Sequence, residues 1–561
     1  MRQQYLREEM RRAPRTEISI DLATIATRWR LEPIPGQNAR PAPAGILNLP
    51  RTGPARSQEE QTPPRSHQPK RTHRPHAHPR RQPQGVTLKS PSPIPTAPGA
   101  LPLLGHVVPL LRDPLGFLTR LPEYGDVVQV RIGPVPVIVV CDPALTRHVL
   151  LHDQTFDKGG LVIERVREFL GNGLATCQYS EHRQQRRLLQ PAFLPARIPG
   201  YTKIVTARSA EMTNSWQDGQ ALDVLATMQE LMARITADTL FSATLPSAVL
   251  DQCLNDLNTI FKGLTLRMLA PPPLDRLPTP GNRHYHQARA RLRHTLSRVI
   301  TDYRSAGTDH GDLLSALLAA LAACGTGTAG HVLTNAEIID QIMTFFFGGS
   351  ETTGATLAWA LYLLGHHPDV EARLHAEADA ILGGRPATHA DLPHLELTDR
   401  IITETLRLWP PGLCFTRTCT ADTRLGPYPI PAGATVAYSA YLLHRRGDLY
   451  PDPERFDPDR WVPGSPGLPR REAFTAFGGG ARRCIGDRLG TAEAVLVLAT
   501  IAARWRLEPL RGARFRPAIG GNTLTVGGLR MSAVARKTAD DPGPADTNRK
   551  DSLSHGEVPR A

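Results

Sequence analysis

The most chemically informative stretch of this chain surrounds one cysteine, in the segment FGGGARRCIG from Phe477 to Gly486. Three glycines, Gly478 to Gly480, precede Cys484, and two arginines stand beside it. Glycine lets the backbone approach a flat ligand closely, because it has no Cβ. Nearby cations stabilise a thiolate, which is the form of cysteine that binds a metal. The spacing therefore favours a thiolate ligand in a tight loop. The alternative is a small buried cysteine in an ordinary glycine-rich turn.

A second stretch, FFFGGSETTG from Phe345 to Gly354, places an acid beside an alcohol. Glycine inside a helix costs about 1 kcal/mol relative to alanine, so the adjacent Gly348 and Gly349 need a reason. Close approach of the helix to a flat ligand is one such reason. Glu351 and Thr352 could then carry protons at a weak point of the helix, although a packed helix with a surface glutamate would give the same pattern.

The helix that carries this acid has a recognisable start. Thr334 and Glu337 have the spacing of a capping box, in which each side chain bonds to the backbone of the other residue. This pattern predicts a long helix from Thr334 to about Gly365. A further helix, Leu489 to Ile501, is expected directly after the cysteine loop.

A third pair, Glu404 and Arg407 in ETLRLWPP, lies at positions i and i+3 and so shares one helix face. Taken alone, such a pair is most often a surface ion pair worth well under about 1 kcal/mol.

Together, these motifs resemble the cytochrome P450 family. The cysteine loop is similar to F-x-x-G-x-R-x-C-x-G, and Gly348 to Thr353 is similar to A/G-G-x-D/E-T-T. The resemblance covers roughly residues 95 to 537, and is greatest to soluble bacterial P450s, in particular actinobacterial terpene-oxidising enzymes of the pentalenene oxygenase type. It implies haem b with Cys484 as the axial ligand of the iron, one haem per chain, and a role for Glu351 and Thr352 in proton delivery to bound dioxygen.

The resemblance also implies residues that hold the haem and the fold around it. Glu404, Arg407 and Arg455 are expected to form a buried structural network behind the haem. The haem propionates need cations, and the matching residues are Arg482, Arg417, His182 and Arg186. Other members of the expected site are Phe477 and Gly349 next to the cofactor, and an apolar substrate pocket lined by Phe346, Phe347, Leu413, Phe415 and Leu524.

The expected fold is mainly α with small β-sheets, in a single large P450 haem domain at residues 91–537. Strands are predicted at Val127 to Ile132 and Val135 to Val140, on either side of a Gly-Pro turn, and helical periodicity dominates from about Ala144. Near the C-terminus, Leu524 to Val526 and Leu529 to Val534 are predicted to be short strands. Residues 1–90 are expected to be a largely disordered extension and residues 538–561 a disordered polar tail.

An internal repeat links the two ends of the chain. Residues 22–36 and 498–512 share twelve of fifteen positions, and a weaker likeness extends to residue 42. One short copy at each end cannot stack as a solenoid. Residues 22–42 therefore resemble a fragment of a P450 C-terminus, joined by duplication or by a translation start set too far upstream.

The composition limits the kinds of molecule and the cellular compartment that are expected for this protein. The net charge is +13, but residues 51–85 carry eight Lys/Arg against two Asp/Glu, which indicates a solvated basic segment and no nucleic-acid site. No apolar run is long enough for a membrane anchor, and the odd number of cysteines fits a reducing cytoplasm.

The sequence thus predicts a monomeric, cytoplasmic haem-thiolate monooxygenase. It would insert one atom of O2 into a hydrophobic small molecule, a terpenoid in secondary metabolism, with electrons from a separate ferredoxin and ferredoxin reductase. The alternatives that remain open are a P450-fold peroxygenase, a fatty acid or polyketide hydroxylase, and a non-catalytic haem-binding protein.

Overall fold

The computed structural model describes residues 93–241, 245–269, 277–324, 334–512, 515–520 and 523–536. Contacts divide the chain into two units, Met1–Leu88 and Lys89–Ala561, and the description below concerns the second unit. The expected extension at 1–90, the first copy of the repeat and the tail at 538–561 lie outside the described residues.

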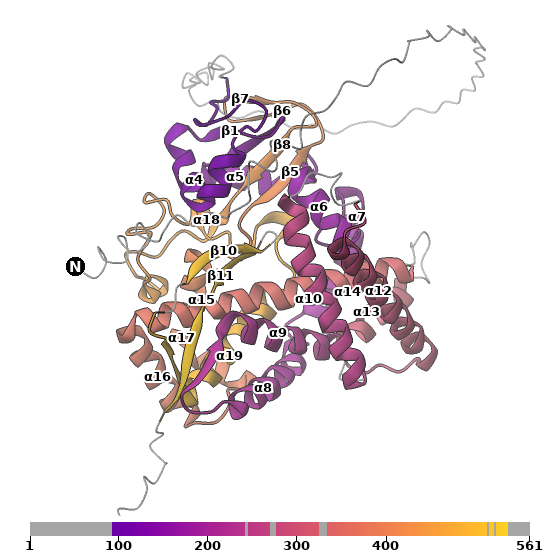
Figure 1. Cartoon of the computed structure of the whole chain (residues 1–561), viewed down its shortest axis with the longest axis vertical. Coiled ribbons are helices and arrows are strands. Elements are labelled where there is room, and N and C mark those ends of the chain that lie inside the picture. The colour runs from indigo at the N-terminus through magenta and orange to yellow at the C-terminus, as the bar shows by residue number, and fades with distance from the viewer. Residues whose placement is uncertain are drawn as a thin grey trace, which may run out of the picture. The chain divides into compact units, whose positions relative to one another are not determined.

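Helices make up most of this unit (Figure 1). The α-helices are α3 (Val107–Arg112), α4 (Pro114–Arg120), α5 (Pro143–Leu151), α6 (Gly160–Leu170), α7 (Tyr179–Leu189), α8 (Ile198–Ser215), α9 (Val224–Phe241), α10 (Ser247–Leu269), α12 (Pro280–Ala306), α13 (Leu313–Cys324), α14 (Asn335–Phe346), α15 (Thr352–His366), α16 (Pro368–Leu382), α17 (Glu396–Leu408), α18 (Ala440–Leu443) and α19 (Asp487–Arg504). Short 3-10 turns are η1 (Leu121–Tyr124), η2 (Gln190–Phe193), η4 (His389–His394), η5 (Pro458–Trp461), η6 (Arg471–Ala473) and η7 (Gly480–Arg482), and η3 (Phe347–Glu351) is a π-helical turn.

The strands form small sheets at the edges of the helical body. The largest sheet has the order β1-β2-β8-β5-β3, and a three-stranded sheet has the order β4-β12-β9; β6 pairs with β7 and β10 with β11. The strands are β1 (Val127–Ile132), β2 (Val135–Val140), β3 (Phe156–Lys158), β4 (Gln220–Asp223), β5 (Phe415–Cys419), β6 (Thr423–Leu425), β7 (Tyr428–Ile430), β8 (Thr435–Tyr438), β9 (Trp505–Pro509), β10 (Arg516–Gly520), β11 (Thr523–Gly527) and β12 (Arg530–Ala535).

The predicted elements are confirmed. Both N-terminal strands have the predicted ends, helices follow from Pro143, and the two C-terminal strands correspond to β11 and β12. The capping box of Thr334 and Glu337 is present, with the Thr334 side chain accepting from the Glu337 amide. The predicted long helix comprises α14, the π turn η3 and α15, and the second copy of the repeat closes α19 and enters β9.

The central helix is α15, whose residues from Thr353 to Leu364 are all buried. It crosses the middle of the described unit in Figure 1, with α9 and α19 packed against it. One core cluster gathers the apolar side chains of α9, α15, α16, α17 and α19, and a second gathers those of α6, α10, α12 and α14. The π turn lies between these two cores, because it joins α14 to α15. No helix in the described ranges has the length and apolar character needed to cross a membrane.

Candidate active site

The loop before α19 presents Cys484 to solvent. Among the cysteines whose side chains the structure describes, only Cys484 is exposed. Its backbone N–H donates to the Phe477 carbonyl at 2.9 Å, which closes the loop on itself. Although the residue is exposed, the protein atoms packed around the loop partly desolvate the sulfur and raise the pKa of the Cys484 thiol, while the Gly486 amide and the guanidinium groups of Arg186 and Arg483 lower it. A cation in contact with this sulfur would bind the thiolate and displace the proton.

The three loop glycines differ in their surroundings. Gly478 and Gly480 have φ of +68° and +63°, a region that side chains with a Cβ rarely enter. A Cβ on Gly480 would lie 2.1 Å from the Leu150 carbonyl oxygen at the end of α5, whereas one on Gly478 would meet nothing within 4 Å. Thus Gly480 is needed to dock the loop on α5, and the side of Gly478 faces open space.

A group of buried cations surrounds the same loop. Arg482 pairs with Asp157 at 2.9 Å and with Asp153 at 3.3 Å. Arg417 on β5 and His182 on α7 are buried. Burial lowers the pKa of His182 to about 3, and Arg482 adds to the effect, so this ring is neutral at pH 7.

Some of these buried groups have polar atoms without a hydrogen-bond partner, namely Nδ1 of His182 and Nε and Nη1 of Arg417. An unpaired buried cation is costly unless an anion or a set of acceptors meets it. The two propionates of haem would supply both, so the residues present fit this cofactor. The predicted grouping of His182, Arg417 and Arg482 is therefore present in the structure.

A further cation in this group, Lys158, was not anticipated from the sequence. It ends β3 directly opposite Arg417 in the antiparallel pairing with β5. Burial and the neighbouring Arg417 and Arg482 lower the pKa of Lys158 well below its usual value. Sequence reasoning missed it because the pairing joins segments about 260 residues apart, and a lysine in a short strand has no motif of its own.

Arg186, the fourth predicted propionate cation, is engaged at the cysteine loop, and its role toward the propionates stays a prediction. Its Nη1 donates to the Arg483 carbonyl and its Nε to Gln190 at 2.9 Å. Arg186 lies one helical turn after His182 on α7 and reaches the cysteine loop. There its positive charge lowers the pKa of the Cys484 thiol.

The weak point predicted in the long helix is the π turn η3. The Thr352 hydroxyl donates to the Gly348 carbonyl at 2.6 Å, and the Ser350 hydroxyl to the Phe346 carbonyl at 2.5 Å. Such back-bonding satisfies carbonyls that the π geometry leaves without their usual partner. Burial raises the pKa of Glu351 to about 7, and a hydrogen bond from Gln229 of α9 opposes the shift. An acid and an alcohol able to handle protons near neutral pH thus lie in adjacent positions.

The two glycines of this turn also have different roles. A Cβ on Gly349 would lie 2.6 Å from Oγ1 of Thr236 on α9, whereas one on Gly348 would meet nothing within 4 Å. Gly349 therefore allows contact with α9, and its role as a cofactor-binding residue stays a prediction. Gly348 is the one with space for a ligand.

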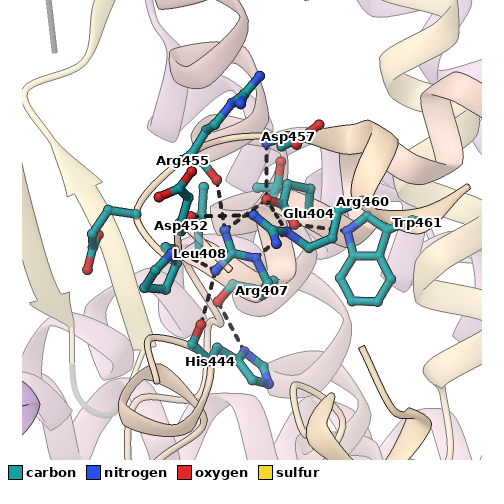
Figure 2. A network of polar contacts seen from close by, with 12 residues as sticks. Glu404, Arg407, Leu408, His444, Asp452, Arg455, Asp457, Arg460 and Trp461 are labelled. Carbon is teal, nitrogen blue, oxygen red and sulfur yellow. Dashed lines mark hydrogen bonds and ion pairs between the residues drawn. The ribbon is translucent and has the colours of Figure 1, made fainter. Parts of the chain in front are cut away.

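Glu404 and Arg407 form a fully buried ion pair with two hydrogen bonds of 2.8 Å (Figure 2). Arg407 also donates to the carbonyls of His444, Pro453 and Arg455. Glu404 accepts from the indole of Trp461 at 2.9 Å and from the amide of Asp457 at 3.1 Å. Every strong acceptor and donor of the pair is engaged, so the network fixes α17 to the segment that follows α18.

The predicted third member of this network, Arg455, is wrong. Its side chain is exposed and points away from Glu404, and only its carbonyl takes part (Figure 2). Arg460 supplies the second guanidinium, buried and 3.5 Å from Glu404. Arg460 is buried in alternation with Phe456 and Pro458, but a charged residue at the end of such a run gives no local sequence signal of its burial.

The predicted pocket residues separate into two groups. Phe346 and Leu524 have no exposed surface, because Phe346 packs on Phe241 and Leu524 lies in a core cluster. The prediction of these two residues as pocket residues is therefore wrong. Leu413 is also buried in that cluster. Phe347 and Phe415 are partly exposed. Phe347 contacts the rings of Phe169 on α6 and Phe261 on α10.

A family model, curated relatives and a solved structure that are similar to this chain all indicate the same protein family. Residues 95–527 match the family model for Cytochrome P450. The chain is 46% identical to cyclooctat-9-en-7-ol 5-monooxygenase of Streptomyces melanosporofaciens, over 74% of this chain and 90% of the relative. It is 41% identical to pentalenene oxygenase of Streptomyces avermitilis, over 79% of this chain and 97% of the relative. The crystal structure of the cytochrome P450DA heme domain superposes with a TM-score of 0.71 at 26% identity, covering 80% of this chain and 99% of that one.

Proposed function

Because the chain belongs to the cytochrome P450 family and is a haem-containing monooxygenase, we propose that it oxygenates a terpenoid in secondary metabolism. The observation that carries the substrate class is the pair of relatives above. One is named for a monooxygenase acting on cyclooctat-9-en-7-ol, and the other is named pentalenene oxygenase. Phe347 and its neighbouring aromatic rings give an apolar wall that suits a hydrocarbon skeleton.

The proposed assignment of haem contacts follows the buried charges. Cys484 would hold the iron, and Lys158, Arg417 and Arg482 would bind the propionates, with the unpaired Nδ1 of His182 as a further polar contact. Bound haem supplies the activation of O2 and the insertion of one oxygen atom into the substrate. Phe477 contributes the carbonyl that holds the backbone N–H of Cys484 in place.

Glu351 and Thr352 are proposed to handle the protons that the reaction consumes. The Glu351 carboxyl can hold or release a proton near pH 7, which is the condition for an effective general acid. The Thr352 hydroxyl donates to the Gly348 carbonyl beside the open face of Gly348, where a ligand has room. In this arrangement Thr352 would give its hydroxyl proton toward that space, and the Glu351 carboxyl would supply the replacement proton from the side of α9.

Electrons are proposed to come from a separate ferredoxin and ferredoxin reductase, with the protein acting as a cytoplasmic monomer. Next to the cysteine loop, Arg488 is exposed and Arg483 is partly exposed and paired with Asp487. Surface cations of this kind attract an acidic partner and speed its encounter.

A substrate screen tests the substrate class. Purified haem-loaded protein is titrated with cyclic terpene hydrocarbons and alcohols, with fatty acids and macrolides as comparison sets, and the Soret band is followed. Terpenoids should convert the haem iron to high spin at micromolar concentration and yield an oxygenated product with ferredoxin and reductase. A spin shift and product with fatty acids alone would overturn the terpenoid proposal.

A further inference from the structure

Helix α9 lies directly against the π turn and the start of α15. A Cβ on Gly354 would lie 3.0 Å from the Gln229 Cα, and one on Gly349 would lie 2.6 Å from the Thr236 hydroxyl. From Gly349 in the π turn to Gly354 in α15, the contact on α9 moves back from Thr236 to Gln229, so α9 and α15 run antiparallel. The two glycines thus bring the backbone of α9 close enough for an α9 side chain to reach the turn.

The side chain that reaches it is Gln229. Its Nε2 donates to Oε2 of Glu351 at 2.8 Å, across 122 residues of sequence. Thr352, the neighbour of Glu351, gives its hydroxyl hydrogen to the Gly348 carbonyl instead. The carboxyl of Glu351 is therefore held toward α9 by an amide, one position away from the alcohol.

Among the described residues, the amide of Gln229 is the polar side chain that affects the pKa of Glu351, and no charged side chain does so. Burial and the Gln229 hydrogen bond are the influences on the pKa of Glu351. The charged groups of the helices packed against the turn have other partners. At α9, Glu230 pairs with Arg234, Arg234 also with Asp251, Asp238 with Arg208, and Asp223 accepts from the Ala226 amide. On α14, Asp340 pairs with Arg293 and Glu337 takes part in the cap, and at the far end of α15 the ring of His366 bonds to the Tyr362 carbonyl.

An amide is suited to a partner that changes its protonation state. It carries both donors and an acceptor, so it can donate to a carboxylate and, after turning over, accept from a protonated carboxyl. A lysine or arginine at this position could only donate, and would hold Glu351 as the carboxylate.

We propose that Gln229 is a positioning residue, which holds the Glu351 carboxyl against α9 and sets how readily it takes up and gives off a proton. The inference rests on the proposed role of Glu351 in proton delivery. It adds that α9, a helix outside the recognised motifs, determines the pH range in which that delivery works.

Three variants of the haem-loaded protein test this role. Gln229→Leu removes the donor and should raise the pKa of Glu351 by about one unit, since a hydrogen bond to a carboxylate is lost. Gln229→Lys adds a cation and should lower that pKa by about one to three units. The matched control is Glu230→Gln, which removes the charge of the exposed residue next to Gln229. This variant should leave the pKa of Glu351 unchanged. If Gln229→Leu does not fold, Gln229→Met removes the same donor.

The first readout needs no turnover. The infrared carbonyl band of protonated Glu351, identified by its loss in Glu351→Gln, is titrated against pH in each variant. Opposite shifts in the leucine and lysine variants, with none in the control, would support the proposal. A band that titrates at the same pH in all of them would overturn it.

The second readout is the ratio of product formed to oxygen consumed, measured against pH. Its decline toward alkaline pH, where Glu351 loses its proton, should move up in Gln229→Leu and down in Gln229→Lys. If the infrared titration shifts while this ratio does not, Gln229 still controls the acid, and the failure belongs to the proposed role of Glu351.

Discussion

At the scale of single residues, the hydroxyl of Thr352 is the group whose removal is most informative. It satisfies the Gly348 carbonyl inside the π turn and lies next to the acid Glu351. Thr352→Ala removes the proton-handling hydroxyl together with the γ-methyl group. We expect the product formed per oxygen consumed to fall by roughly tenfold or more, with peroxide released in its place.

The matched control is Thr352→Ser, which keeps the hydroxyl. It should retain most of the coupling between oxygen use and product. Unchanged coupling in Thr352→Ala, measured with an oxygen electrode and product quantification, would contradict the role proposed for this side chain.

Arg460 and Arg455 form a natural pair of variants five residues apart. Arg460 is buried against Glu404, whereas the Arg455 side chain is exposed and contributes only its carbonyl. Arg460→Ala should lower the free energy of unfolding by about 3–5 kcal/mol, because it leaves Glu404 with less compensation in a dry site. Arg455→Ala should stay within about 0.5 kcal/mol of the parent. Denaturant unfolding of both variants measures this, and the reverse order would contradict the network in Figure 2.

At the scale of elements, the cysteine loop depends on its contact with α5. Gly480→Ala puts a methyl group 2.1 Å from the Leu150 carbonyl and also strains a positive φ. We expect a loss of roughly 3–5 kcal/mol in stability, and poor haem incorporation. Gly478→Ala strains a similar φ but meets no atom within 4 Å, so about 1–2 kcal/mol is expected. Thermal unfolding and haem content separate the two, and equal effects would argue against docking on α5.

The elements themselves could be predicted from sequence because their patterns are local. Alternation of apolar residues and a Gly-Pro turn are enough to define β1 and β2, and a capping box defines the start of α14. The π turn was anticipated only as a weak point, since its geometry depends on contact with α9. Gly349 illustrates the limit: the sequence shows a glycine in a helix, and only the neighbouring Thr236 gives the reason for it.

The site residues that sequence reasoning missed share one physical property. Lys158, Gln229 and Arg460 act through partners distant in sequence, so no local spacing marks them. Cys484, Glu351 and Glu404 lie in compact motifs and could be identified directly. Arg186 also lies in a compact motif, but its hydrogen bond to the Arg483 carbonyl joins residues 297 apart and could not be predicted from that motif.

At the scale of the whole molecule, the cofactor and the fold are coupled through buried charge. Arg417 is buried with two unpaired nitrogens, which the haem propionates are proposed to meet. Arg417→Ala should release haem about ten to a hundred times faster, the effect of losing a hydrogen bond between charged groups. Arg424→Ala, an exposed arginine on β6, is the control and should not change the rate. Transfer of haem to excess apomyoglobin measures this, and equal rates would contradict the propionate assignment.

The central claim is that this chain holds haem iron through the Cys484 thiolate, and the spectrum of the reduced carbon monoxide complex tests it most directly. The parent protein should show the red-shifted Soret band of thiolate ligation, and folded, haem-loaded Cys484→His should show the band of an imidazole-ligated haem instead. The same red-shifted band in Cys484→His, or its absence from correctly folded parent protein, would contradict the account.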